Sequence, residues 1–328
     1  MLALLLASLL TLVELNCENL FDTRHDSLKQ DEEFLPTGMR HWTPTRYWHK
    51  LNHIGQEIVA SGEHGNTQRT STSLAFPANN WQLPSLAVLC EVENDSVLYD
   101  LTHRSVLRTA GYKYIMTHSA DLRGIDVALL YDPFVFRLLH RQDLDVPLLP
   151  GMRPTRQVLY ACGISIGTAD TLHLIAVHAP SRAGGEKATR AFRLQVTHRV
   201  IEVTDSILHR QPSALIIVAG DFNDYAEAPA LDTLVHHGLH HISYGAVGSH
   251  GAKGTYRYRG QWGSLDHILC SPAMATKLID CYIIDHPFLL EPDEKYGGQR
   301  PMRCYYGGKY QNGYSDHLPL VARFKMQP

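Results

Sequence analysis

The sequence lacks an excess of positive charge. Its 30 lysines and arginines are outnumbered by 33 aspartates and glutamates, which gives a net charge of -3 with the histidines neutral. A protein that coats nucleic acid needs the opposite balance, because its affinity comes from neutralised phosphates. The composition therefore excludes a polycationic nucleic-acid coat, but it leaves open an enzyme with a local basic groove.

Paired cysteines are also missing. The six cysteines form no CxxC pair and no dense framework, and most lie inside apolar runs such as "LAVLCEVE" and "LDHILCS". We therefore expect buried free thiols rather than disulfides or a structural zinc site. The 20 histidines are scattered. We interpret the cluster "HHGLHH" (236–241) as a polar helix end and loop rather than a metal site.

Long apolar runs are rare. After residue 13 no stretch approaches ~20 continuous apolar residues, so we expect no membrane span. The segment "MLALLLASLLTLV" (1–13) resembles the apolar core of a signal peptide, but no basic residue precedes it and no clear cleavage motif follows. We favour a first buried strand with an apolar leader. The compartment, cytoplasmic or exported, stays open.

Helical periodicity is sparse and strand patterns are frequent. Residues 43–62 predict a helix, with Thr43 as cap and Pro44 in the first turn. Helices are also expected over 95–110 and 187–210. Residues 61–82 and 285–314 are expected to be long loops. We see no repeat and no dividing linker, so residues 1–328 are expected to form one domain.

The apolar runs include 85–94, 214–223 and several shorter segments. Many strands with few helices argue against a doubly wound parallel sheet, because that architecture needs a helix at nearly every crossover. Two packed mixed sheets with helices outside fit the pattern better.

Several apolar runs end in residues that bind metals or move protons. These endings are Asn16 and Glu18, Glu91 and Glu93, His178, Asp221 and Asn223, Asp266 and His267, and Asp316 and His317. One polar strand end is ordinary, but six in one chain predict a shared site at the rim of a sheet.

Carboxylate and amide oxygens suit a hard cation, which predicts Mg²⁺, with Mn²⁺ as the alternative. A hard cation together with histidines is typical of sites that catalyse phosphoryl transfer. The cation neutralises phosphate charge, a carboxylate directs water, and histidines stabilise the developing charge.

With these motifs in their order, from "LNCENLFD" to "YSDHLPLV", the sequence resembles the endonuclease/exonuclease/phosphatase superfamily, which includes deoxyribonuclease I. The forms "NCENLFD", "RGIDVALLYD" and "HAPSRAGGE" look most like its bacterial branch. The resemblance implies an α/β fold, a four-layer α/β/β/α sandwich. It also implies a metal-dependent hydrolase that acts on phosphate esters.

The resemblance further implies roles for individual residues. Glu91 matches the principal metal ligand, with Asn16, Glu18 and Asp316 as further metal-binding candidates. Asn16 also stands beside the phosphate. Asp221 matches the residue that orients or deprotonates the attacking water, and Asn223 matches its phosphate-contacting partner. His317 matches the histidine on the scissile phosphate, Asp266 the carboxylate that orients it, and His178 the second histidine.

Three finer expectations follow from these assignments. Asp126 is a loose candidate to pair with His178. Strand alternation predicts that Glu93 shares a face with Glu91, although Glu91 is preferred as the ligand. The same alternation places Asp221 and Asn223 on one side and turns Asp224 away, and Gly220 is expected to let the backbone approach the site.

The substrate is left open between alternatives. The tyrosines and basic residues of 295–310 and of "YRYRGQWG" (256–263) suit a nucleic-acid strand, which we prefer slightly, but also a sugar or lipid phosphate. Arg182 and Tyr306 are candidate substrate contacts, and Lys187 and Arg190 are weaker ones. Alternatives are a phosphatase or phosphodiesterase of inositol phosphate or sphingomyelin type and, less favoured, a non-catalytic relative. We expect a monomer with no obligate protein partner.

Overall fold

The computed structural model describes residues 8–63 and 81–326. Within them, two six-stranded sheets pack face to face. The first sheet contains β1 (Ser8–Leu20), β2 (Leu86–Val92), β3 (Lys113–Met116), β4 (Asp126–Tyr131), β13 (Leu278–Ile283) and β18 (Leu320–Met326), in the order β13-β18-β1-β2-β4-β3. The second contains β5 (Phe136–Leu144), β6 (Val158–Ser165), β7 (Thr171–His178), β8 (Leu215–Asp221), β9 (His240–His241) and β12 (Asp266–Cys270), in the order β5-β6-β7-β8-β12-β9.

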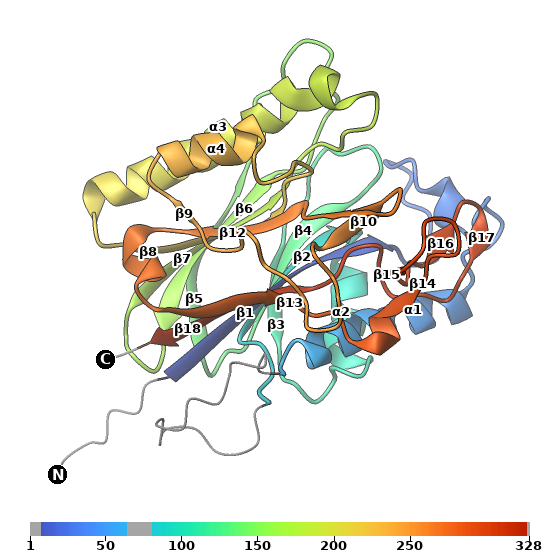
Figure 1. Cartoon of the computed structure of the whole chain (residues 1–328), viewed down its shortest axis with the longest axis horizontal. Coiled ribbons are helices and arrows are strands. Elements are labelled where there is room, and N and C mark those ends of the chain that lie inside the picture. The colour runs from blue at the N-terminus through green and yellow to red at the C-terminus, as the bar shows by residue number, and fades with distance from the viewer. Residues whose placement is uncertain (1–7, 64–80, 327–328) are drawn as a thin grey trace.

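Helices cover the outer faces of the two sheets. The helices α1 (Pro44–Ala60) and α2 (Asp95–His103) belong with the first sheet, while α3 (Glu186–Arg210) and α4 (Pro229–His236) cover the second (Figure 1). A short α5 (Pro272–Ala275) and two 3-10 turns, η1 (Glu32–Phe34) and η2 (Pro287–Leu289), complete the helical part. The predicted four-layer α/β/β/α sandwich is confirmed. None of the helices in the described ranges is long and apolar enough to cross a membrane.

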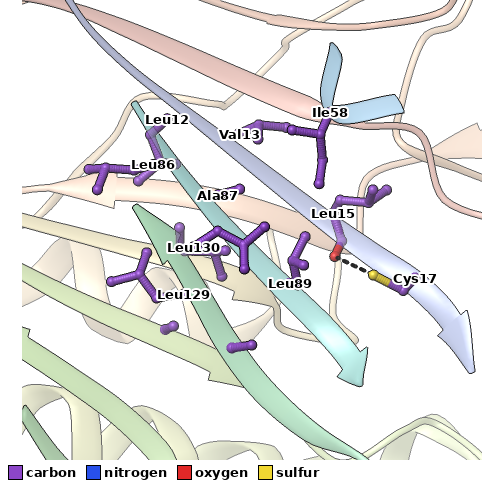
Figure 2. Packing of buried hydrophobic residues seen from close by; sticks show 14 of the residues in the cluster. Leu12, Val13, Leu15, Cys17, Ile58, Leu86, Ala87, Leu89, Leu129 and Leu130 are labelled. Atoms are coloured by element: carbon purple, nitrogen blue, oxygen red, sulfur yellow. Dashed lines mark hydrogen bonds between the residues drawn. The ribbon is translucent and has the colours of Figure 1, made fainter. Parts of the chain in front are cut away.

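The central strands are buried on both faces, which explains their nearly continuous apolar sequence. Alternation along β1 sends Val13, Leu15 and Cys17 to the helical side, where Figure 2 shows them near Ile58 of α1. The even positions of β1 turn toward the second sheet, and Asn16 bonds to Asp221 there. All six cysteines lie in the described part of the chain and are free thiols, as expected, but Cys162 and Cys281 are only partly buried.

Most predicted elements form, with shifted ends. Thr43 caps α1 by accepting from the backbone N–H of Arg46. The expected helix 95–110 ends at His103, because the Ser105 hydroxyl donates to the Leu101 carbonyl and accepts from the Leu107 N–H, replacing helical hydrogen bonds. In the cluster 236–241, α4 ends as expected, but His240 and His241 form the edge strand β9 rather than a loop.

The two predicted long loops, 285–314 and 61–82, have different outcomes in the structure. The segment 285–314 contains η2 and two hairpins, β14 (Leu290–Pro292) with β15 (Gln299–Pro301) and β16 (Tyr305–Tyr306) with β17 (Lys309–Tyr310). A third hairpin, β10 (Tyr256–Tyr258) with β11 (Gln261–Gly263), lies beside β15.

The apolar segment 1–13 enters β1 from Ser8, and residues 1–7 lie outside the described residues. Of the segment 61–82, Glu63 and Trp81 form a β-bridge and 64–80 lie outside the described residues.

Candidate active site

The sheet registers explain why residues far apart in sequence meet. β7 and β8 run parallel and pair His178 with Asp221, and β12 runs antiparallel to β8 and pairs Asp266 with the same Asp221. In the facing sheet β1 and β2 are also parallel, so Asn16 and Glu91 reach the same edge. Because the two sheets face each other, their edges form one rim.

A cavity of about 370 Å³ opens at this rim, and we call it the rim cleft. The residues predicted from sequence that line it are Asn16, Glu18, Glu91, His178, Asp221, Asn223, Asp316 and His317. Asp266 is fully buried and lies behind His317. The structure therefore brings together the whole predicted catalytic and metal-binding set.

His317 and Asp266 form a buried hydrogen-bonded pair. The Nδ1 atom of His317 lies 2.7 Å from Oδ2 of Asp266, which also accepts from the Thr255 hydroxyl. Burial opposes charge on the imidazole, but Asp266 outweighs it, and the pKa of His317 lies well above its usual value. The geometry thus holds a protonated imidazole at the cleft.

Asp221 is held by two amides. Its Oδ2 accepts from the Asn16 side chain at 3.0 Å and the Asn223 side chain at 3.2 Å, and its Oδ1 accepts from the Asn223 N–H at 2.7 Å. Burial, followed by the nearby Asp266 charge, raises the pKa of Asp221 to about 7. A carboxylate with this pKa is suited to accept a proton near neutral pH.

His178 is the second buried histidine of the cleft. Its Nε2 lies 3.7 Å from Asp221 Oδ2 and 4.0 Å from Glu91 Oε1, and its Nδ1 has no hydrogen-bond partner among the described residues. Burial and then the nearby Arg156 charge hold its pKa well below the usual value, so the ring is neutral. Asp126 does not pair with it, because this carboxylate bonds to Thr117 and to the Ser119 N–H.

Strand alternation fails at the ends of β2 and β8. Glu91 has φ of +63° at a register break, so it turns into the cleft, whereas Glu93 turns away and accepts from the Asp22 N–H. Asn223 also has a left-handed backbone, φ +52°, and reaches the cleft through that turn rather than through alternation. These conformations are uncommon for residues other than glycine and are frequent at functional sites.

The contacts of Asp224 and Gly220 test two further expectations about the end of β8. Asp224 points away from the cleft, as predicted, and forms an ion pair with buried Arg193 at 2.7 Å. Gly220 serves strand packing rather than the site, because a Cβ there would lie 1.9 Å from the Val177 carbonyl oxygen of β7.

Glu91 is the best-presented candidate metal ligand. Its Oε2 is fixed by the Asn19 N–H at 2.8 Å, which leaves Oε1 directed at the cleft, 3.6 Å from Arg123. Asp316 and Glu18 also line the cleft, but both contact Arg303, at 2.6 and 3.5 Å.

Glu18 in addition accepts from the backbone N–H groups of Cys304 and Tyr305. It therefore ties the 303–305 segment to the rim. Burial and then the Asp316 charge raise the pKa of Glu18 to about 7.

Of the three predicted substrate contacts, Asn16 lines the rim cleft, whereas Arg182 and Tyr306 lie outside it. Arg182 stacks on Tyr225, with its guanidinium 4.3 Å from the ring centre. Tyr306 lines a neighbouring cavity, and Tyr305 takes the place at the cleft.

Sequence reasoning also missed several residues. Arg123 lines the cleft, and Arg156 donates to the backbone carbonyls of His178 and Ala179 from a buried position. Tyr256 and Arg303, expected only as members of the segments 256–263 and 295–310, also line the cleft. Glu14 is fully buried on β1, and burial, followed by Asp266 and Asp221, raises its pKa well above the usual value. The only sequence signal for Glu14 is a single acid inside an apolar strand.

The donor set fits a hard divalent cation. Four carboxylates, from Glu18, Glu91, Asp221 and Asp316, converge on one cleft beside the Asn16 amide. Burial, and then a neighbouring carboxylate, raises the pKa of two of these groups: the neighbour is Asp316 for Glu18 and the buried Asp266 for Asp221. Separately, Asp221, Asp266 and His317 bring one potential ligand atom each within 4.8 Å of one another.

The chain is similar to known proteins in both sequence and fold. A sequence profile described as "Endonuclease/Exonuclease/phosphatase family" matches residues 11–326. No curated protein sequence shows significant similarity to the chain.

Solved structures share the fold at low identity. An endonuclease/exonuclease/phosphatase family protein from Bacteroides thetaiotaomicron is 15% identical with a TM-score of 0.59, covering 97% of this chain and 98% of its own. A mannosyl-6-phosphatase from the same organism is 16% identical, with a TM-score of 0.57 and coverage of 95% and 98%. The human Nocturnin catalytic domain with bound sulfate is 14% identical, with a TM-score of 0.55 and coverage of 97% of both chains.

Proposed function

This chain belongs to the endonuclease/exonuclease/phosphatase family, and on that premise we propose that it is a divalent-metal-dependent hydrolase that cleaves phosphodiester bonds in the rim cleft. One observation carries the proposal. Two buried histidines flank Asp221 in different surroundings: His317 Nδ1 lies 2.7 Å from Asp266 Oδ2, which raises the pKa of His317, whereas burial lowers the pKa of His178, whose Nε2 lies 3.7 Å from Asp221 Oδ2. Residues that only stabilise the fold do not require two histidines with opposite pKa shifts. Phosphate-ester hydrolysis uses an acid, a neutral hydrogen-bond donor and a base.

Asp221 is the base in this scheme. The amides of Asn16 and Asn223 fix its carboxylate, so that it orients a water molecule and takes a proton from it. The water oxygen forms the new bond to phosphorus as the ester oxygen leaves. Asn223 acts here mainly by holding Asp221, because its amide nitrogen is committed to Asp221 and to the Ala179 carbonyl.

The histidines act on the phosphate. Nδ1 of His317 is bound to Asp266, so Nε2 is the ring atom that donates to the phosphate and protonates the leaving oxygen. Neutral His178 donates from Nε2 to a phosphate oxygen without adding a charge. Asp266 serves as a positioning residue that keeps His317 protonated.

The metal assignment rests on the oxygens that line the cleft. Glu91 Oε1 makes no hydrogen bond to a described residue, whereas Asn16 Oδ1 accepts from the Glu18 N–H and both Glu18 oxygens accept from backbone N–H groups. Glu91 would hold the cation through Oε1, with Asn16, Asp316 and Glu18 as further oxygen donors. When bound, Mg²⁺ or Mn²⁺ neutralises phosphate charge and stabilises the leaving oxygen. The trio of Asp221, Asp266 and His317 is the poorer alternative, because Asp266 is fully buried behind His317 and does not line the cleft.

A nucleic-acid backbone is our preferred substrate, since arginines and tyrosines border the cleft. A phosphatase or phosphodiesterase of small-molecule or lipid phosphates is the second candidate. The modest cleft volume of about 370 Å³ favours it, and a mannosyl-6-phosphatase shares the fold. A non-catalytic relative fits less well, because the predicted catalytic side chains meet in one place.

A substrate panel tests the proposal. Plasmid DNA, abasic duplex, RNA, inositol phosphates, sphingomyelin and bis(p-nitrophenyl) phosphate should be incubated with Mg²⁺, with Mn²⁺ and with EDTA. We expect at least one diester to be hydrolysed with the metal and none with EDTA. Activity that persists in EDTA would overturn the metal assignment, and inactivity on every substrate would favour the non-catalytic reading.

A further inference from the structure

A second cavity adjoins the rim cleft and has its own chemistry. We call it the side pocket; it measures about 250 Å³ and is lined by Tyr258, Arg259, Lys295, Tyr296, Arg300 and Tyr306. Tyr256, Arg303 and Asp316 line both cavities, so the side pocket is adjacent to the cleft. The two cavities therefore share one wall.

Each of three exposed tyrosines in the side pocket carries a cation on its ring. Arg259 lies 5.2 Å from the centre of Tyr258, Lys295 lies 5.1 Å from Tyr296, and Arg300 lies 4.3 Å from Tyr306. Five cationic side chains face the pocket against only two carboxylates, Asp293 and Asp316.

Two of these cations are unpaired. Arg300 is bound to Glu291 at 2.8 Å, but no carboxylate within the described ranges pairs with Arg259 or Lys295. The pocket thus has an excess of positive charge that its own acids leave uncompensated, which is the condition for binding an anion.

The pocket wall is fixed by a buried guanidinium. Arg257 donates to the backbone carbonyls of Gly260, Gly297 and Gln299 and pairs with Asp293 at 3.1 Å, so it ties the β10–β11 hairpin to the 293–299 turn. These elements lie on the same side of the molecule in Figure 1. Asp293 in turn accepts from the N–H groups of Lys295 and Tyr296.

Gly260 completes the junction, because a Cβ there would lie 2.7 Å from Cβ of Tyr296. The exposed cations therefore project from a cross-linked scaffold rather than from a loose loop. Preorganisation of this kind reduces the entropy lost when a ligand is bound.

We propose that the side pocket binds a second phosphate group of the substrate whose scissile phosphate occupies the rim cleft. This inference rests on the proposed hydrolase function. It makes Arg259 and Lys295 specificity-determining residues that favour substrates with two phosphates over substrates with one. A 5′-phosphorylated nucleotide and a sugar bisphosphate both supply this chemistry.

The test compares matched substrates in the full-length protein. The rate constant kcat/KM is measured for 5′-phosphorylated dithymidylate against dithymidylate, for inositol 1,4-bisphosphate against inositol 1-phosphate, and for bis(p-nitrophenyl) phosphate. Wild type should prefer the doubly phosphorylated member of at least one pair by on the order of tenfold, since charge-assisted phosphate contacts are among the stronger hydrogen bonds. The pair that shows the preference identifies the source of the second phosphate.

The double variant Arg259→Ala/Lys295→Ala should lose this preference and keep its rate on bis(p-nitrophenyl) phosphate. The control Arg104→Ala/Lys113→Ala removes two exposed cations that line neither cavity, one of them 5.2 Å from the ring of Tyr99, and should keep the preference. A preference that survives in the Arg259→Ala/Lys295→Ala variant overturns the inference, as does an equal loss on the generic diester.

Failure of the hydrolase proposal is a separate outcome. If wild type hydrolyses none of these compounds, calorimetry of wild type with the two dithymidylates still tests the pocket. Tighter binding of the 5′-phosphorylated form, lost in the Arg259→Ala/Lys295→Ala variant, supports the second-phosphate site, and equal binding of both forms refutes it.

Discussion

The opposite protonation of the two cleft histidines can be tested through Asp266→Asn. His178 and His317 are both almost fully buried, with 3% and 6% of their surfaces exposed, yet their pKa values move in opposite directions. The difference is Asp266, whose Oδ2 lies 2.7 Å from Nδ1 of His317. An asparagine keeps the shape of the carboxylate and removes its charge.

The size of the effect follows from this geometry. Two unit charges about 4 Å apart at an effective dielectric constant of about 20 attract by about 4 kcal/mol. Loss of that attraction changes the protonation equilibrium of His317 by a factor of about 10³. We therefore expect kcat at pH 7.5 to fall by about 10²–10³-fold, within the range of a lost general acid.

The assay is the pH profile of kcat/KM on bis(p-nitrophenyl) phosphate between pH 5 and 9. In Asp266→Asn the high-pH limb should move to lower pH, and activity should recover partly on acidification, because His317 can then be protonated. The matched control is Asp126→Asn, a buried aspartate bonded to Thr117 and Ser119 that should leave the profile unchanged. A wild-type profile in Asp266→Asn, with activity within threefold, would refute the reasoning.

Two further predictions concern stability. Burial raises the pKa of Glu57 to about 8, and neither carboxyl oxygen has a hydrogen-bond partner among the described residues. The folded protein thus holds a proton that the unfolded chain releases between about pH 4.5 and 8, so stability falls as pH rises through that window, by on the order of 3 kcal/mol at pH 7.5. Glu57→Gln should flatten this slope in urea unfolding measured at pH 5 and 7.5, and an unchanged slope would contradict the account. Gly220→Ala, at φ +151°, should destabilise by roughly 2–6 kcal/mol because its Cβ meets the Val177 carbonyl. The control Gly308→Ala, with open space around its Cβ, should be near neutral, and equal stability of the two variants would show the reasoning to be wrong.

The fold and most of the site were predictable because they depend on local signals. A continuous apolar run predicts a central strand, buried on both faces, without any information about which strands lie beside it. Polar residues at the ends of such runs collect at a sheet edge once the strands are in register. His178, Asp221 and Asp266 illustrate this, since adjacent β7, β8 and β12 place them at paired positions.

The wrong predictions concern side chains whose position depends on an unusual backbone conformation or on hydrogen bonds made in the folded chain. Glu93 was expected on the face of Glu91, but a left-handed Glu91 breaks the alternation. Asp126 was a candidate partner for His178, but it bonds to the nearby Thr117 and to the Ser119 N–H instead. Sequence periodicity contains neither kind of information.

Several residues that the sequence did not assign individually to the cleft reach it from remote segments. Arg303 and Tyr305 arrive on the 285–314 segment, whose hairpins are set by non-local contacts such as Glu18 with the Cys304 N–H. In the sequence Glu14 is a single acid in an apolar strand, and only the packing of β1 against β8 and β12 brings it close enough to Asp221 and Asp266 for their charges to raise its pKa.

The central claim is that Asp221 and His317 carry out metal-dependent phosphate-ester hydrolysis in the rim cleft. The most direct measurement is the rate of bis(p-nitrophenyl) phosphate hydrolysis with Mg²⁺ by wild type, Asp221→Asn and His317→Ala, with Glu93→Gln as control because Glu93 turns away from the cleft. Both site variants should remain folded and lose at least about 10²-fold in rate, the control should be fully active, and EDTA should abolish wild-type activity. Retention of most activity by both site variants would contradict the account.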